Sequence, residues 1–154
     1  MREYKFRAWN KEYNVMIQAE SFQLCQMWIS GIGEVFEIGE WSDYGGGGKT
    51  EDDCSDQYIL MQYTGLKDRN GNDIYEGDIL KITFDQSYVD KPFYIGVVTY
   101  QAYEGYPAFD LEPWVDCDMN ALSWLKSESD PSVVSYEVIG NRFDNPELLE
   151  EVRE

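Results

Sequence analysis

The chain has 154 residues, enough for one domain (residues 1–154) with a buried hydrophobic core. Its formal net charge of −18 disfavours direct binding to nucleic acid or to an anionic membrane, because both are negatively charged themselves. Aromatic residues make up 16% of the chain, which a disordered acidic chain would lack, so the protein is expected to fold.

Two further features bear on the cellular compartment. No stretch approaches the roughly 18 to 20 apolar residues that span a bilayer, and residues 1–10 contain no signal-peptide core. Cys25, Cys54 and Cys117 are odd in number, widely spaced and match no paired metal-binding spacing. We therefore expect a cytoplasmic protein with reduced thiols.

Alternating apolar and polar residues predict a series of short strands, separated by turns that contain glycine, asparagine or aspartate. The first strand is expected to expose Lys5 and Arg7 on the face opposite Phe6, and residues 10–14 form the turn after it. The strands are expected at residues 4–9, 15–24, 33–41, 57–63, 78–84, 93–100, 106–114 and 132–141.

Residues 42–56 interrupt this pattern. They contain four consecutive glycines and a cluster of acids, and they offer little apolar surface to bury, so we expect a flexible acidic loop. The run GGGGK at residues 45–49 lacks the flanking strand and helix of a phosphate-binding loop. A flexible linker is therefore the favoured interpretation of these glycines.

A short helix is predicted at residues 118–126. Met119, Leu122 and Leu125 have helical spacing there, and Asp118 is suited to be the N-cap.

Residues 144–152 favour a second helix near the end of the chain. Asn145 is suited to cap it, Pro146 suits the first helical position, and Glu147 complements the helix dipole. Together these elements predict a mainly β fold. We expect a small barrel or sandwich of short antiparallel strands with one or two short helices, including a C-terminal one.

The central stretch TGLKDRNGNDIYEGDIL has some features of a calcium-binding loop. Asp68, Asn70 and Asn72 occupy the first, third and fifth positions of an EF-hand count. However, Asp73 stands where a glycine is needed, and Ile79 stands where a bidentate glutamate should close the shell. A turn is the favoured interpretation, because Asn-Gly accommodates positive φ and the aspartates can accept bonds from nearby backbone N–H groups.

The residue types restrict the chemistry that the chain can perform. The chain has no histidine, which excludes Ser-His-Asp and Cys-His catalysis and histidine-ligated zinc. No cofactor or metal is expected. The five tryptophans are expected mainly in the core or in hairpin pairs. Acids adjacent in sequence favour solvated faces over an acid/base pair; they are Asp73, Glu76, Asp78, Asp110, Glu112, Asp116 and Asp118.

Four segments carry a resemblance to a known family. They are REYKFRAWN, LMQYTGLKDRNGNDIYEGDIL, GVVTY and YEVIGNRFDNPELLE, which together span almost the whole chain. In this order they resemble the YopX family of phage and prophage proteins. The resemblance implies a predominantly β protein with a barrel-like core and a phage-encoded origin. It brings no established activity or catalytic residues, so it does not imply an enzyme. Residues 42–56 lie outside these motifs.

Three functions remain open at this point. The first is a non-enzymatic accessory protein that binds a host or phage protein through exposed β edges or an aromatic and acidic surface. The second is an acidic mimic of DNA that occupies the basic groove of a host nucleic-acid-binding protein. The third is a carboxylate- or metal-dependent enzyme, which needs a pocket with convergent acids.

The first of these functions is favoured, so the expected partner is a host or phage protein, with no direct contact to nucleic acid or membrane. The sequence leaves the oligomeric state undecided. The candidate interaction surface combines the acidic loop with the central turn, and its residues are Asp52, Asp53, Asp56, Tyr75, Glu76 and Asp78.

Overall fold

The computed structural model describes residues 3–22, 26–31, 33–88, 90–101, 108–113, 122, 125 and 132–150. The fold is mainly β, with antiparallel strands and short 3-10 turns, and the described residues contain no long helix. The chain divides into two compact units. We call Tyr4–Gln62 the N-terminal unit and the residues from Tyr63 onward the C-terminal unit. That residues 1–154 unfold as one cooperative domain stays a prediction.

The N-terminal unit contains two groups of paired strands. In the first, β1 (Phe6–Asn10) lies between β2 (Val15–Ile17) and the first half of β6 (Tyr58–Lys67). In the second, β4 (Val35–Asp43) lies between β3 (Met27–Ile29) and β5 (Gly46–Asp53). A small core joins the two groups, and its buried members are Ala8, Met27, Val35, Cys54 and Tyr58.

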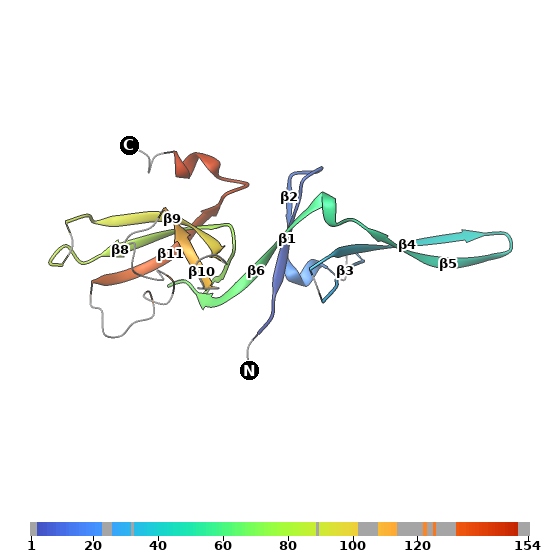
Figure 1. Ribbon diagram of the computed structural model, residues 1–154, viewed down its shortest axis with the longest axis horizontal. Coiled ribbons are helices and arrows are strands. Elements are labelled where there is room, and N and C mark those ends of the chain that lie inside the picture. The colour runs from blue at the N-terminus through green and yellow to red at the C-terminus, as the bar shows by residue number, and fades with distance from the viewer. Residues whose placement is uncertain are drawn as a thin grey trace. The chain divides into compact units, whose positions relative to one another are not determined.

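The C-terminal unit is built on a curled four-stranded sheet, half of a barrel (Figure 1). Its order is β10-β9-β8-β11, and the second half of β6 pairs with the short strand β7 beside it. The bounds are Asp73–Tyr75 (β7), Asp78–Phe84 (β8), Phe93–Gln101 (β9), Ala108–Glu112 (β10) and Val133–Asn141 (β11). The core contains Ile74, Leu80, Ile82, Phe84, Val98, Leu111, Leu122 and Leu125.

Most of the predicted strands are confirmed, and β8 has the predicted bounds. The predicted strand at residues 15–24 is wrong for residues 18–22, because β2 ends at Ile17 and a 3-10 turn follows at Ala19–Ser21, and residues 23 and 24 lie outside the described residues. The three-residue strand β3 was not predicted, since so short a segment carries no alternation. The expected small barrel or sandwich is confirmed as a mainly β fold of antiparallel sheets, one of which is curled into half of a barrel.

The expected loop at residues 42–56 is wrong as secondary structure. β4 and β5 pair in an unbroken register from Phe36↔Asp53 to Asp43↔Gly46. A two-residue turn joins them, and the Asp43 carboxylate accepts a hydrogen bond from the Gly45 N–H at 2.8 Å. A loop is expected from the sequence because this segment has little apolar surface to bury. In the structure β4 begins at the buried Val35, and its backbone pairing with β5 continues from there to the turn. Flexibility of this segment stays a prediction.

The expected C-terminal helix is only a 3-10 turn, Pro146–Leu149. Asn145 is at its N-cap and Pro146 is in its first turn, as predicted, but the Asn145 side chain makes no capping bond. Its Oδ1 instead accepts from the Asn141 N–H at 3.4 Å. The predicted helix at 118–126 lies outside the described residues, apart from the two buried leucines Leu122 and Leu125.

Candidate functional site

The central turn is held together by the carboxylate of Asp68. Its oxygens accept hydrogen bonds from the N–H of Asn70 at 2.8 Å, the N–H of Asn72 at 2.9 Å, the Asn72 side chain at 3.0 Å and the Val138 N–H at 3.1 Å. Burial by itself would raise the pKa of Asp68, but the bonds from Asn72, Val138 and Asn70 outweigh it and lower the pKa. Because the carboxylate oxygens are occupied by these donors, the predicted turn is confirmed.

The same turn covers the outer edge of β11. The Arg69 N–H donates to the Tyr136 carbonyl at 3.0 Å, next to the bond from Val138 to Asp68. The Arg69 guanidinium lies 3.8 Å from the Glu137 carboxylate. An exposed strand edge invites pairing with other chains, so this stretch has a clear structural role.

In the bend at residues 75–78, two of the three residues that the sequence places on the surface are buried. Asp78 is only 1% exposed, and its Oδ2 accepts from the Tyr75 N–H at 2.8 Å. Tyr75 is buried too, whereas Glu76 is half-buried. Gly77, with φ of 80°, donates to the Val98 carbonyl at 2.8 Å. The expected exposure is therefore wrong for Tyr75 and Asp78, because this bend is packed against β9.

The β4–β5 hairpin, which we call the acidic arm (residues 35–53), has the opposite character. β3 pairs only with residues 35–37, and beyond it β4 and β5 continue as a two-stranded ribbon (Figure 1). From Glu40 to Gly47 every residue is exposed on both faces. Trp41 is 51% exposed, and Tyr44 in the turn is fully exposed.

The acidic arm carries six acids and one base. Asp52 and Asp53 are exposed, as is Asp56 just beyond the arm, so the predicted exposure of these three residues is confirmed. The hydroxyl and N–H of Ser55 donate to Asp53 at 2.6 and 3.0 Å and lower its pKa, which keeps this carboxylate charged. The six acids are Glu37, Glu40, Asp43, Glu51, Asp52 and Asp53.

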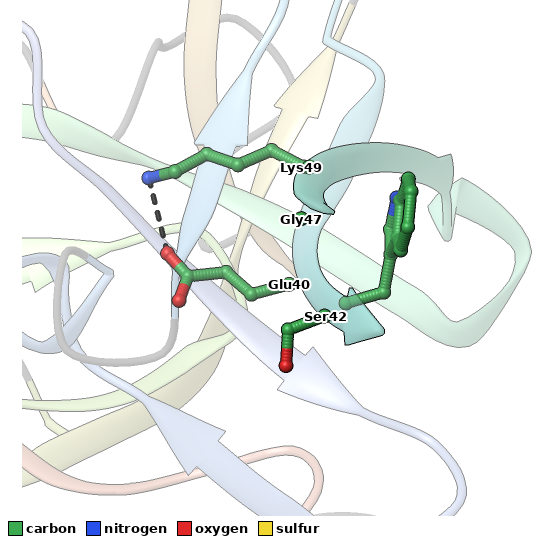
Figure 2. A pocket seen from close by; sticks show the side chains of 6 residues that line it. Glu40, Ser42, Gly47 and Lys49 are labelled. Carbon is green, nitrogen blue, oxygen red and sulfur yellow. Dashed lines mark ion pairs between the residues drawn. The ribbon is translucent and has the colours of Figure 1, made fainter. Parts of the chain in front are cut away.

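An open hollow lies across the arm near its tip (Figure 2). On one side Lys49 Nζ is 3.2 Å from Glu40 Oε1, an exposed ion pair that contributes little stability. On the other side the Trp41 indole lies against the opposite strand, where a Cβ at Gly48 would be 3.0 Å from Nε1. Trp41 therefore forms the hairpin pair that the sequence predicts for tryptophans, and Gly48 leaves room for its ring. Glu40, Trp41, Ser42, Gly47, Gly48 and Lys49 line the hollow.

At its base the acidic arm is fixed by Tyr58, whose hydroxyl donates to the Glu37 carboxylate. Burial and this bond raise the pKa of Tyr58 to about 12, so the phenol stays protonated. Burial also raises the pKa of Cys54, as does the negative charge of Glu37. Cys54 is free, as predicted, but it is a protonated buried thiol and a poor nucleophile. Cys25 and Cys117 lie outside the described residues.

The remaining acids that the structure describes do not gather into a site. The expected solvated position is wrong for Asp110, which is buried, and confirmed for Glu112, which is exposed. Asp116 and Asp118 lie outside the described residues. In the described part of the chain, no three aspartate, glutamate or cysteine side chains are grouped so that they could hold a metal ion. Nor do its helical segments include one with the length and hydrophobicity that a membrane crossing requires.

Sequence and structure comparisons give a consistent result. A family model described as YopX protein matches residues 5–150. Among solved structures, protein EF1440 from Enterococcus faecalis is similar with a TM-score of 0.56 and 24% identity, over 97% of this chain and 99% of that one. Protein YopX from Bacillus subtilis is similar with a TM-score of 0.55 and 23% identity, over 96% of this chain and 98% of that one. None of the curated proteins matches the chain. At these identities the two structures support the fold alone.

Proposed function

This chain belongs to the YopX family, and from that premise we propose that it is a phage- or prophage-encoded accessory protein that binds a partner protein and is not an enzyme. The acidic arm is the surface that binds, and the partner presents a basic surface to it in the host cytoplasm. One observation carries the proposal: the arm is a two-stranded ribbon with both faces exposed over its outer part.

The outer part of this ribbon, from Glu40 to Gly47, is exposed along its whole length. An isolated two-stranded hairpin is marginally stable in water, because it buries little apolar surface. Here the exposed part holds Trp41 and Tyr44, residue types that are enriched in the centres of protein interfaces. A partner that packs on the arm would bury both rings and complete the ribbon.

The charge of the acidic arm determines the kind of partner. With six acids to one base, the arm repels other acidic surfaces and attracts basic ones, which raises the rate of encounter more than the final affinity. The protein as a whole is also strongly acidic, so its net charge attracts a basic partner from a longer distance than the arm alone would. The complex should therefore form quickly and weaken as salt is added.

The proposal is tested by capturing proteins from a lysate of the host bacterium with three tagged forms of the chain. The first is the wild type, and the second is an arm variant with Glu51→Gln and Asp52→Asn. The third is a control that loses the same charge at two exposed acids of the C-terminal unit, Asp90→Asn and Glu147→Gln. We expect a basic protein that the wild type and the control retain and the arm variant loses.

Equal capture by all three forms would contradict the proposal, because the arm would then contribute nothing specific. If added DNA displaces a captured nucleic-acid-binding protein at constant ionic strength, DNA mimicry replaces general protein binding as the function. The acids lie in both units of the chain and on both faces of the arm, so no single face is marked as an array of phosphate mimics.

A further inference from the structure

We infer that the free edge of β5 binds an extended basic segment of the partner, which adds to the sheet as an antiparallel strand. This inference rests on the proposed function and specifies how the acidic arm binds. It follows from three observations: the direction of the backbone groups of β5, its position as the end strand of its sheet among the described strands, and the charges beside its outer edge.

The backbone of β5 presents a row of hydrogen-bonding groups away from β4. The Cys54 N–H donates to the Val35 carbonyl at 2.8 Å, so Cys54 faces β4. In an antiparallel pair, alternate residues turn their N–H and C=O groups toward and away from the neighbour. The register from Phe36↔Asp53 to Asp43↔Gly46 has no break, so the alternation continues along β5. The residues that face outward are Gly47, Lys49, Glu51 and Asp53.

This edge differs from the comparable edge in the C-terminal unit. The outer edge of β11 is covered by Asp68 and Arg69, which take up the Val138 N–H and the Tyr136 carbonyl. β5 is the end strand of its sheet, and no strand in the described part of the chain pairs with its outer side. It is eight residues long, so it can accept a strand of ordinary length.

The side chains beside the edge decide which strand can bind. Glu51 and Asp53 lie on the same face of β5, about 7 Å apart at the usual rise of a strand. A second copy of this chain would bring its own acids against them, and like charges opposite each other are destabilising. Lysine or arginine at alternate positions of a partner strand would lie directly opposite these two acids. Farther along β5 from these two acids, Gly47 has no side chain and leaves room for a larger residue of the partner strand.

A designed peptide tests this mode of binding on the full-length chain. The two-lysine peptide, Thr-Thr-Lys-Thr-Lys-Thr-Thr with blocked ends, places its lysines opposite Glu51 and Asp53. In that antiparallel register the lysine N–H groups face β5, and the N–H groups of the second, fourth and sixth residues, all threonines, face solvent. N-methylation of both lysine N–H groups should weaken binding about tenfold, because two hydrogen bonds are lost. N-methylation of the central threonine and the one after the second lysine should change the affinity less than about twofold.

Two outcomes overturn the inference. Equal affinity of the two methylated peptides means that charge alone attracts the peptide. No binding of the unmodified peptide means that the edge does not accept a strand. In both cases the capture experiment still decides independently whether the acidic arm binds a basic protein, so the two failures can be told apart. A variant with Glu51→Gln and Asp53→Asn should also bind the peptide less tightly, whereas the control with Asp90→Asn and Glu147→Gln should not.

Discussion

At the scale of single residues, Asp68 shows how a metal-like pattern can serve a structural purpose. An ionised carboxylate only accepts hydrogen bonds, and here the acceptor positions are filled by N–H groups from the turn and from β11. The alternating Asp and Asn residues look like calcium ligands because the same oxygens suit both purposes. The missing glycine and glutamate of the calcium pattern distinguish the two cases in the sequence.

Replacing Asp68 with asparagine should lower the free energy of unfolding by about 1–3 kcal/mol at neutral pH. The new amide group would turn N–H donors toward backbone donors at a site that is only 6% exposed. Chemical denaturation checks this, with Asp90→Asn at an exposed position as the control. An unchanged stability of the Asp68 variant would contradict the role given to this carboxylate.

The effect of this substitution should depend on pH. The pKa of Asp68 is lowered in the folded state, so its contribution is complete above the unfolded value of about 3.9. That contribution is lost as the pH falls through the lower folded value, since the wild type then protonates the same group. The difference between wild type and variant should therefore narrow in acid. A difference that stays constant down to the acid limit of folding would argue against a charged Asp68.

Tyr58 gives a prediction with the opposite sign. Its pKa is raised to about 12, so the neutral phenol stabilises the fold fully below the unfolded value of about 10 and loses this effect as the pH rises through 12. Tyr58→Phe should cost about 1 kcal/mol at neutral pH, and the cost should shrink above pH 10. Denaturation across this range measures it, with Tyr13→Phe at an exposed position as the control. A cost that grows in alkali would contradict the prediction.

At the scale of elements, the strands that bury one face could be predicted from the sequence, and the others could not. β8 alternates from Leu80 to Phe84 because Leu80, Ile82 and Phe84 belong to the core of the half-barrel, so its pattern reports its structure. The glycines of β5 carry no such pattern, and their order comes from backbone pairing with β4 and from the ring of Trp41 over Gly48. The C-terminal turn has good helix signals, but the cap residue Asn145 bonds to Asn141 instead.

Trp41→Ala should loosen the outer part of the acidic arm without affecting the core. The indole covers Gly48, and aromatic cover of a strand glycine stabilises the local pairing. Hydrogen exchange should become faster at the amides of β5 that bond to β4, and remain unchanged in β8 and β9. Trp41→Phe should keep most of the protection. Unchanged exchange in β5 would mean that the ring does not support the arm.

Only part of the candidate interaction surface could be predicted, because the burial of its residues depends on how their elements pack. The exposure of Asp52, Asp53 and Asp56 could be predicted, because these residues lie in a stretch without hydrophobic alternation. Tyr75 and Asp78 look equally polar in sequence, but the bend that contains them is packed in the C-terminal unit. The free edge of β5 could not be foreseen, because it depends on which strand lies at the end of a sheet.

At the scale of the whole molecule, the net charge of −18 acts against the compact state, because like charges repel. Raising the salt from low to physiological ionic strength should therefore raise the midpoint of thermal unfolding. The control with Asp90→Asn and Glu147→Gln carries less charge and should gain slightly less. A lower midpoint at physiological salt would show that attractive ion pairs outweigh the repulsion.

The acids are spread over both units, so binding by general attraction and binding at the acidic arm must be separated experimentally. The most direct measurement follows the amide chemical shifts of the labelled chain during titration with the two-lysine peptide at physiological salt. We expect the largest changes in Gly46–Asp53, with saturation at one peptide per chain. Changes spread evenly over the acids of both units, or no changes at all, would contradict a binding site on the acidic arm.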